Sequence, residues 1–439
     1  MAPEPNRSVK FRAALKREIP VLIQRGILTE EGASKITSLY EFDDIGKESS
    51  RLLAAVLFTL ASLLIGGGVI SFVAAHWNEI SRGPKVALLF GTLLAFYIAG
   101  YWFKYRSGWP RLGHALIFCG CLIFGANIGL LAQIYQVSGS WYGLFGVWAV
   151  GVLLMSWAVR SWITGVLVIV TSLVWMVGFA NDYHERLATV YPFLLAITLL
   201  PLAWVIRSRV LYTLTFLGLI CALPALAIAQ LSADGYMLIA LAAGGFLSWA
   251  VGEFHRATGL REEFGTPLVN LGIAALASGA FLWSFKHMWH WLDLGDPNQF
   301  YWLIPAGCAV AAGVAAIARA WPKMDGSQRR FALGAIMVFV LVCLAMPSYR
   351  FNRVLPVIIT NLAALVIAGV CIGRGILEER RLIFWAGSLY VATLVISRFF
   401  EYESSLLLKS VAFILCGIIT MIAGIAYERF LHRREAVVQ

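Results

Sequence analysis

The sequence predicts an all-α fold: a polytopic bundle of about fourteen membrane-crossing helices, with a small helical hairpin at the N-terminus. Hydrophobic residues make up 60% of the 439 residues and charged residues only 13%, whereas soluble domains are about half apolar and about a quarter charged. The apolar residues form continuous runs, such as Leu52–Ile65, and nearly every charge lies between two runs. The mean hydropathy of +0.78 agrees with this pattern.

The length and continuity of the runs indicate helices. A bilayer core is about 30 Å thick, and a helix needs about twenty apolar residues to cross it. The strands of a membrane β-barrel alternate apolar and polar residues instead. Lipid offers no hydrogen bonds, so the backbone of each run must satisfy its own amides, as a helix does.

The polar N-terminal segment predicts two short helices. Val9–Ile23 is amphipathic, and we expect Pro20 to kink or divide it. Gly26 suits the end of that helix, and Thr29 suits the N-cap of a second helix that runs to about Tyr40.

This organisation divides the chain into three parts. Residues 1–50 form the head, residues 51–430 the transmembrane bundle and residues 431–439 a basic tail. The predicted spans are 52–75, 84–103, 112–133, 141–159, 162–181, 189–206, 209–230, 236–252, 266–285, 301–320, 330–347, 354–373, 381–397 and 406–428.

The distribution of Lys and Arg predicts the orientation. If the head is cytoplasmic, the inner loops and tail hold eighteen basic residues and the outer loops hold seven. Cytoplasmic loops carry the excess of Lys and Arg in membrane proteins, so both termini are expected in the cytoplasm. The seven outer residues are Arg82, Lys85, Arg186, Lys286, Arg350, Arg353 and Arg398.

Composition and motifs also narrow the classes of function. The net charge of +11 lies beside the spans, where basic residues meet lipid headgroups, so we expect the bilayer and no nucleic acid as a partner. The seven cysteines all lie within apolar runs, which predicts packing residues and neither disulfides nor a metal site. No P-loop, HExxH or GxSxG motif is present. We therefore expect no cofactor, and the sequence favours a non-enzymatic role over an enzymatic one.

Charged residues at the last outer turn are one candidate site. Arg398, Glu401 and Lys409 lie at or just inside the outer ends of the last two spans, and ionisable groups in spans are costly and often functional. We interpret them as a candidate polar centre that binds an anion or relays protons. The alternative is a structural ion pair, with Lys409 extending its ammonium group to the interface.

Uncharged polar residues within the spans are a second candidate site. Asn127 and Gln133 lie in the third span and Asn361 in the twelfth. They are candidates for lining a polar cavity, and hydrogen bonds between helices are the alternative. Asn127 and Gln133 are six residues apart, so they are expected to face different neighbours.

Several segments together resemble a known family. They are the head sequence Gly26–Ile36, the glycine-rich first span that ends at Asn78, Leu131–Tyr135, and Arg398–Tyr402. This combination resembles the bacterial predicted membrane proteins catalogued as domain of unknown function 2157. The head and the first four or five spans resemble the named domain. The resemblance implies a location in the bacterial inner membrane and no particular reaction.

Three functions remain open at this stage. The first-ranked is a carrier or flippase-like protein for a small or amphipathic solute, because of the many spans, the prolines within them and the few polar groups. The second is a membrane-anchored assembly or sensory protein whose head, residues 9–40, binds a cytoplasmic protein. The third is an intramembrane enzyme that acts on a lipid-linked substrate through Glu401 or the outer histidines His287 and His290.

Overall fold

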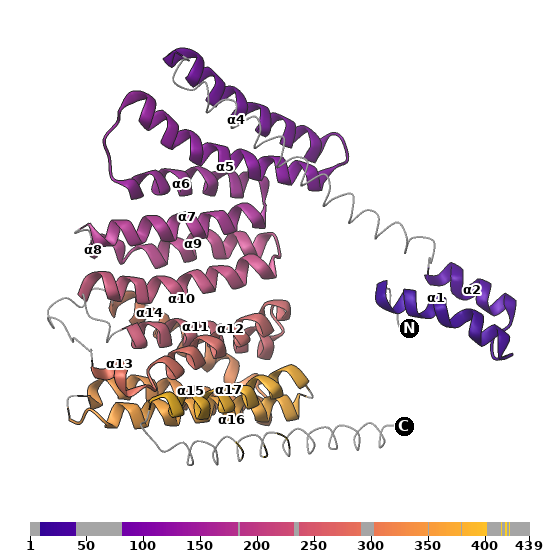
Figure 1. Ribbon diagram of the computed structural model, residues 1–439, viewed down its shortest axis with the longest axis vertical. Coiled ribbons are helices and arrows are strands. Elements are labelled where there is room, and N and C mark those ends of the chain that lie inside the picture. The colour runs from indigo at the N-terminus through magenta and orange to yellow at the C-terminus, as the bar shows by residue number, and fades with distance from the viewer. Residues whose placement is uncertain are drawn as a thin grey trace. The chain divides into compact units, whose positions relative to one another are not determined.

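A computed structural model describes residues 9–40, 81–182, 185–231, 237–290, 303–349, 351–378 and 380–401, with residues 414, 418 and 421. These residues are helical apart from short turns (Figure 1). The elements are α1 (Val9–Gln24), α2 (Glu30–Tyr40), α4 (Arg82–Tyr105), α5 (Pro110–Tyr135), α6 (Trp141–Val159), α7 (Trp162–Asn181), α8 (Glu185–Ala188), α9 (Tyr191–Val205), α10 (Arg209–Leu231), α11 (Met237–Thr258), α12 (Glu262–Leu282), α13 (Lys286–His290), α14 (Leu303–Ala320), the 3-10 turn η3 (Trp321–Lys323), α15 (Gly326–Ser348), α16 (Leu355–Leu377) and α17 (Arg381–Glu401).

The N-terminal helices α1 and α2 pack against each other as a hairpin. Gly26 adopts a left-handed φ of +69° after α1, and the Thr29 hydroxyl accepts a hydrogen bond of 3.2 Å from the Gly32 amide at the start of α2. Pro20 does not divide α1, which continues through it and loses only the hydrogen bond that proline cannot donate. The apolar cluster between the helices comprises Leu15, Ile19, Ile23, Leu28, Ala33 and Ile36.

Ten of the described helices are long and apolar enough to cross a membrane, and each corresponds to a predicted span. They are α4, α5, α6, α7, α10, α11, α12, α14, α15 and α16. The predicted spans 189–206 and 381–397 correspond to α9 and α17, while 52–75 and 406–428 lie outside the described residues. The all-helical membrane fold is thus confirmed, and the total of fourteen spans stays a prediction.

Several helix ends differ from the predicted ones, among them those of α9, α11 and α16. α9 has 15 residues, about 22 Å at 1.5 Å per residue, because Pro192 in its first turn marks its beginning. α11 continues to Thr258 and α16 to Leu377, beyond the predicted ends at 252 and 373. Charged side chains occupy these extra turns, and they remain helical because they are paired with one another.

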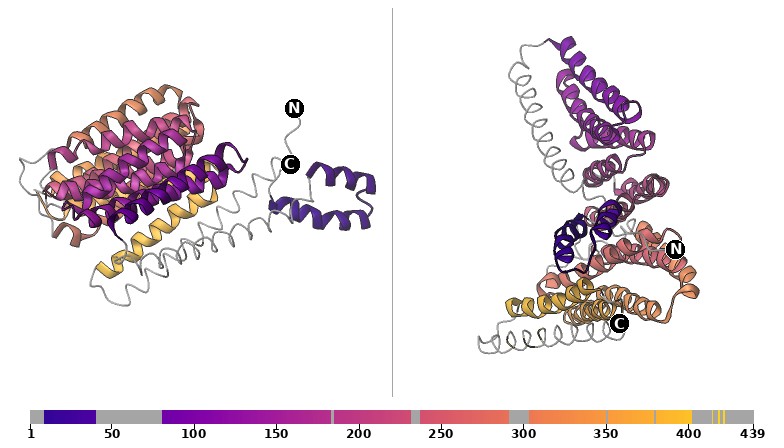
Figure 2. Two further views of the ribbon diagram at one scale, coloured as in Figure 1. Left: turned by 90° about the horizontal axis from the view of Figure 1, so that it is seen from above. Right: turned by 90° about the vertical axis from the view of Figure 1, so that its right-hand side faces the viewer.

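Within the unit formed by residues 89–439, α10 and α11 link two groups of helices. α10 packs on α7, α9 and α11, and α11 packs in turn on α12, α14 and α15. Figure 2 shows these helices running along a common direction. One apolar core lies around α7, α9 and α10, a second among α11, α12, α15 and α16, and a third among α11, α12, α14 and α15.

Glycines bring α11 and α12 into backbone contact. A Cβ atom on Gly272 of α12 would lie 2.6 Å from the Gly245 carbonyl oxygen, and a Cβ on Gly265 would lie 3.0 Å from the Gly252 carbonyl oxygen. The two glycines of each helix are seven residues apart and so share a face. Small residues of this kind allow membrane helices to pack closely without a hydrophobic driving force.

We expect Gly272→Ala to lower the free energy of unfolding by about 1–3 kcal/mol, because the added methyl group overfills the α11–α12 contact. The matched control is Gly369→Ala on α16, where a Cβ meets no atom within 4 Å and alanine favours the helix. Unfolding of the purified protein in mixed micelles measures both. An equal loss of stability in the two variants would contradict the close contact.

Candidate functional site

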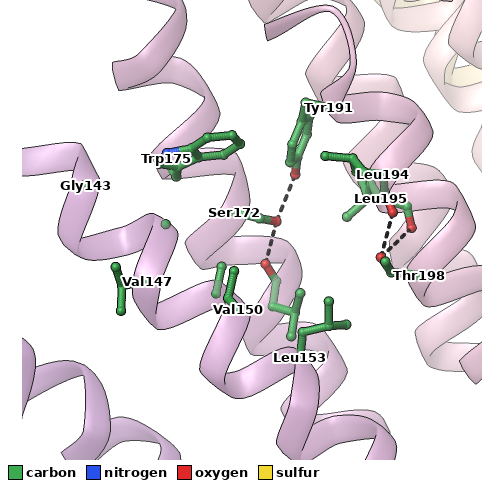
Figure 3. A pocket seen from close by; sticks show the side chains of 13 residues that line it. Gly143, Val147, Val150, Leu153, Ser172, Trp175, Tyr191, Leu194, Leu195 and Thr198 are labelled. Atoms are coloured by element: carbon green, nitrogen blue, oxygen red, sulfur yellow. Dashed lines mark hydrogen bonds between the residues drawn. The ribbon is translucent and has the colours of Figure 1, made fainter. Parts of the chain in front are cut away.

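A groove of about 620 Å³ lies between α6, α7 and α9 (Figure 3). α6 packs along α7, whereas α9 packs mainly on α10, so the side of α7 between α6 and α9 is left open. Its volume is in the range of ligand-binding pockets. The lining residues are Gly143, Gly146, Val147, Ala149, Val150, Leu153, Val168, Ser172, Trp175, Tyr191, Leu194, Leu195 and Thr198.

The hydroxyl groups of the groove are hydrogen-bonded within the protein. The Ser172 hydroxyl donates to the Val168 carbonyl at 2.5 Å, so its oxygen accepts the hydrogen bond of 3.0 Å that joins it to the Tyr191 hydroxyl. The Thr198 hydroxyl donates to the Leu194 carbonyl at 2.7 Å. The groove therefore presents a predominantly apolar surface to whatever occupies it.

The rim of the groove faces sideways. Val147, Val150 and Leu194 are 57%, 60% and 50% exposed. α6 and α7 are of membrane-spanning length, so apolar side chains exposed on this face contact lipid. The groove consequently opens on the lateral face of these helices.

Small residues and one aromatic stack shape the walls. Trp175 of α7 rests on Gly146 of α6, where a Cβ atom would lie 2.7 Å from its ring. The Trp175 ring stacks on Phe179 with a centroid distance of 5.0 Å, and its centroid lies 6.4 Å from that of Tyr191. The aromatic rings thus form the end of the groove nearest the C-terminus of α7.

Two residues of the predicted polar centre meet at the turn after α12. The Arg398 guanidinium pairs with Glu401 on α17 and donates to the Ser284 carbonyl at 2.9 Å. Glu401 also accepts from the Lys286 amide. Lys409 lies outside the described residues. The pair fastens α17 to the α12–α13 turn, and its role as an anion or proton site stays a prediction.

The predicted cavity-lining residues occupy three different environments. Asn361 donates to the Ser284 carbonyl at 3.0 Å, which places it beside Arg398 at the same turn. Buried Asn127 donates to the Leu89 carbonyl of α4 at 2.8 Å, and Gln133 is exposed on α5. The groove between α6, α7 and α9 has other lining residues, so a cavity role for these three stays a prediction.

A buried ion network joins α11 to α16 at the opposite ends of the helices. Arg374, whose side chain is 2% exposed, lies 3.2 Å from Glu378. Glu378 also pairs with Arg256 at 2.9 Å, and Arg256 pairs with Glu253 at 3.2 Å. One carboxylate thus binds two guanidinium groups from two helices.

The sequence pattern did not reveal this network, because the predicted spans end at 252 and 373 and leave all four residues in inner loops. The available signal was their spacing: Glu253 and Arg256 are three apart, and Arg374 and Glu378 are four apart, as in ion pairs along a helix. Burial raises the pKa of Glu378, but the adjacent Arg374 and Arg256 outweigh it and hold this pKa below its ordinary value of 4.5.

Comparison with known proteins confirms the family resemblance over the N-terminal third of the chain. Residues 21–165 match the family model described as "Predicted membrane protein (DUF2157)". The matched segment includes α2, α4, α5 and α6, so it contributes one of the three walls of the groove. No curated protein and no solved structure matches the chain.

We expect Glu378→Ala to lower the free energy of unfolding by about 3–5 kcal/mol, because it leaves the buried Arg374 charge without its partner. Arg380→Ala is the matched control. Arg380 is 48% exposed and lies 3.6 Å from Glu378, and an exposed pair of this kind contributes about 0–1 kcal/mol. Unfolding in mixed micelles compares the two variants, and similar losses would argue against a buried network.

The network also predicts a dependence of stability on pH. A carboxylate whose pKa is lower in the folded state stabilises the fold above its unfolded pKa, and this stabilisation is lost as pH falls through the folded pKa. For Glu378 this stabilisation is expected to be lost below pH 4.5, the ordinary pKa of the group. In Glu378→Gln the stability should vary less with pH in this window than in the parent protein. Parallel curves for the two proteins would refute the assignment.

Proposed function

We propose that this chain, whose residues 21–165 match the DUF2157 family of predicted membrane proteins, is a carrier for an amphipathic solute. The observation that supports the proposal is the apolar groove between α6, α7 and α9, which opens laterally toward lipid. An amphipathic molecule dissolves in the bilayer before it meets the protein, so a lateral opening gives its chain a direct entry path.

The construction of α9 supports movement of the solute along the groove. α9 has 15 residues, with Pro192 in its first turn and Pro201 in its interior. Prolines remove hydrogen bonds from a helix, and transporters place such interrupted helices at their binding sites. Since α9 has few contacts with α7, its shift relative to α7 would change the width of the groove without breaking the α6–α7 pair.

The proposed location is the bacterial cytoplasmic membrane, with both termini in the cytoplasm. Arg256, from one predicted inner loop, and Arg374 and Arg380, from another, gather around Glu378. At the other ends of the helices, Arg398, from a predicted outer loop, meets the α12–α13 turn at the outer end of the predicted span 266–285. Residues of predicted inner and outer loops thus lie at opposite ends of the helices. This supports the alternation of inner and outer loops on which the predicted orientation depends.

A second candidate function is partner binding by the α1–α2 hairpin, which would make the protein an assembly or sensory component. Ile27 and Val21 are 69% and 38% exposed on this hairpin. Its apolar cluster is small, so a cytoplasmic partner protein that covers Ile27 would add burial that the hairpin lacks.

The carrier proposal predicts that filling the groove stops transport. We expect Val150→Trp to reduce movement of fluorescent single-chain amphiphiles between leaflets of reconstituted vesicles by about tenfold or more, because the indole occupies the opening. Accessibility of the probe to an aqueous quencher measures the movement.

The matched control is Leu154→Trp, on the same helix. Leu154 is 69% exposed and is not among the lining residues, so this substitution adds the same side chain outside the groove. It should leave transport unchanged. Equal rates in parent vesicles, Val150→Trp vesicles and protein-free vesicles would overturn the proposal.

A further inference from the structure

We propose that a polar recess at the aromatic end of the groove binds the ammonium headgroup of a single-chain cationic amphiphile, whose chain lies in the groove. This inference rests on the proposed carrier function and names its substrate class. The recess has a volume of about 530 Å³, and its lining residues are Gly139, Ser140, Trp141, Tyr142, Gly178, Asn181 and Asp182.

The recess follows the groove along the same two helices. On α7, Ser172 and Trp175 line the groove, and Asp182, which directly follows the helix, lines the recess. Ser172 and Trp175 are three residues apart and share a face of the helix, and Gly178, three residues further on, lines the recess. On α6, Tyr142 of the recess immediately precedes Gly143 of the groove. The ten residues from Ser172 to Asp182 span about 15 Å, half the thickness of the hydrocarbon core.

The charge of the recess favours a cation. Among the described residues, its lining includes one carboxylate, Asp182, and neither lysine nor arginine. The Tyr142 hydroxyl donates to Asp182 Oδ2 at 2.6 Å and thereby holds the carboxylate at the recess. An anionic headgroup would meet this carboxylate without a compensating charge from the described lining residues.

The aromatic side chains favour an alkylated ammonium group in particular. The rings of Trp141 and Tyr142 lie edge to face, with centroids 6.0 Å apart and planes at 85°, so they form two walls of a corner. Trp141 is 63% exposed and its face can accept a ligand. Aromatic walls of this kind recognise quaternary ammonium through the negative face of the ring.

The groove beside this recess supplies the site for the rest of the molecule. Its hydroxyls are already hydrogen-bonded within the protein, so an alkyl chain can occupy it without leaving them unpaired. One groove adjoins one recess, which suits an amphiphile with one chain. The assigned ligand class is therefore a long-chain alkylammonium ion.

Binding of dodecyltrimethylammonium to the full-length protein in nanodiscs tests the proposal, with dodecanoate as the anionic ligand of equal chain and empty nanodiscs as the blank. We expect the ammonium ligand to bind about tenfold more tightly than dodecanoate. Asp182→Asn and Trp141→Ala should each weaken ammonium binding about threefold to tenfold, and neither should weaken dodecanoate binding.

Trp162→Ala is the matched control. Trp162 lies at the other end of α7 and is 44% exposed, so its removal should leave both affinities unchanged. If both ligands bind equally well and both lose affinity in Val150→Trp, the recess proposal is wrong and the groove remains a binding site. If neither ligand binds above the blank, the carrier proposal fails together with it.

Discussion

The rest of the structure depends on one constraint: lipid cannot satisfy the carbonyl groups that a helix leaves free at its end. Side chains from other helices satisfy them here. The Ser284 carbonyl after α12 receives Arg398 from α17 and Asn361 from α16. At the opposite ends of the helices, Lys104 of α4 donates to the Val159 carbonyl of α6 at 2.5 Å. Each such bond fixes where a helix ends and also which helix is its neighbour.

The same constraint explains why the polar residues lie where they do. A charged side chain near lipid must be paired, so Arg374 and Glu378 extend α16 beyond its apolar part and bind Arg256 of α11. Between the two charged ends, packing replaces electrostatics, and the glycine contacts of α11 and α12 allow the backbones to approach. α11, α12 and α16 are thus fixed at both ends or along their length, whereas α9 has neither a charged cap nor a glycine face toward α7. The groove lies beside α9, where both the charged cap and the glycine contact are missing.

The sequence predicted the helices well because bilayer thickness imposes their length. It predicted the ends of α11 and α16 too early, because charge was taken as a sign of a loop, whereas Glu253 and Arg374 belong to an ion network that joins the two helices through Arg256 and Glu378. The groove could not be predicted at all. Val150 and Leu154 are both exposed apolar residues of α6, and only the position of α9 makes one of them line a cavity. The two positions carry similar residue types, and only their location relative to α9 in the folded protein distinguishes them.

The groove and the recess have different physical roles in the proposed carrier. Apolar contact with the groove is nondirectional and scales with buried area, so it distinguishes poorly between alkyl chains of similar length. Since its hydroxyls are satisfied internally, they add little discrimination either. Selectivity must arise where a ligand meets an ionic group held in a fixed geometry, and Tyr142 holds Asp182 in that way. Discrimination between ligands is a difference of two affinities, and the recess lowers one of them by repelling anions. In the proposed carrier, the groove contributes affinity for any alkyl chain, and the Asp182 carboxylate determines which headgroup binds.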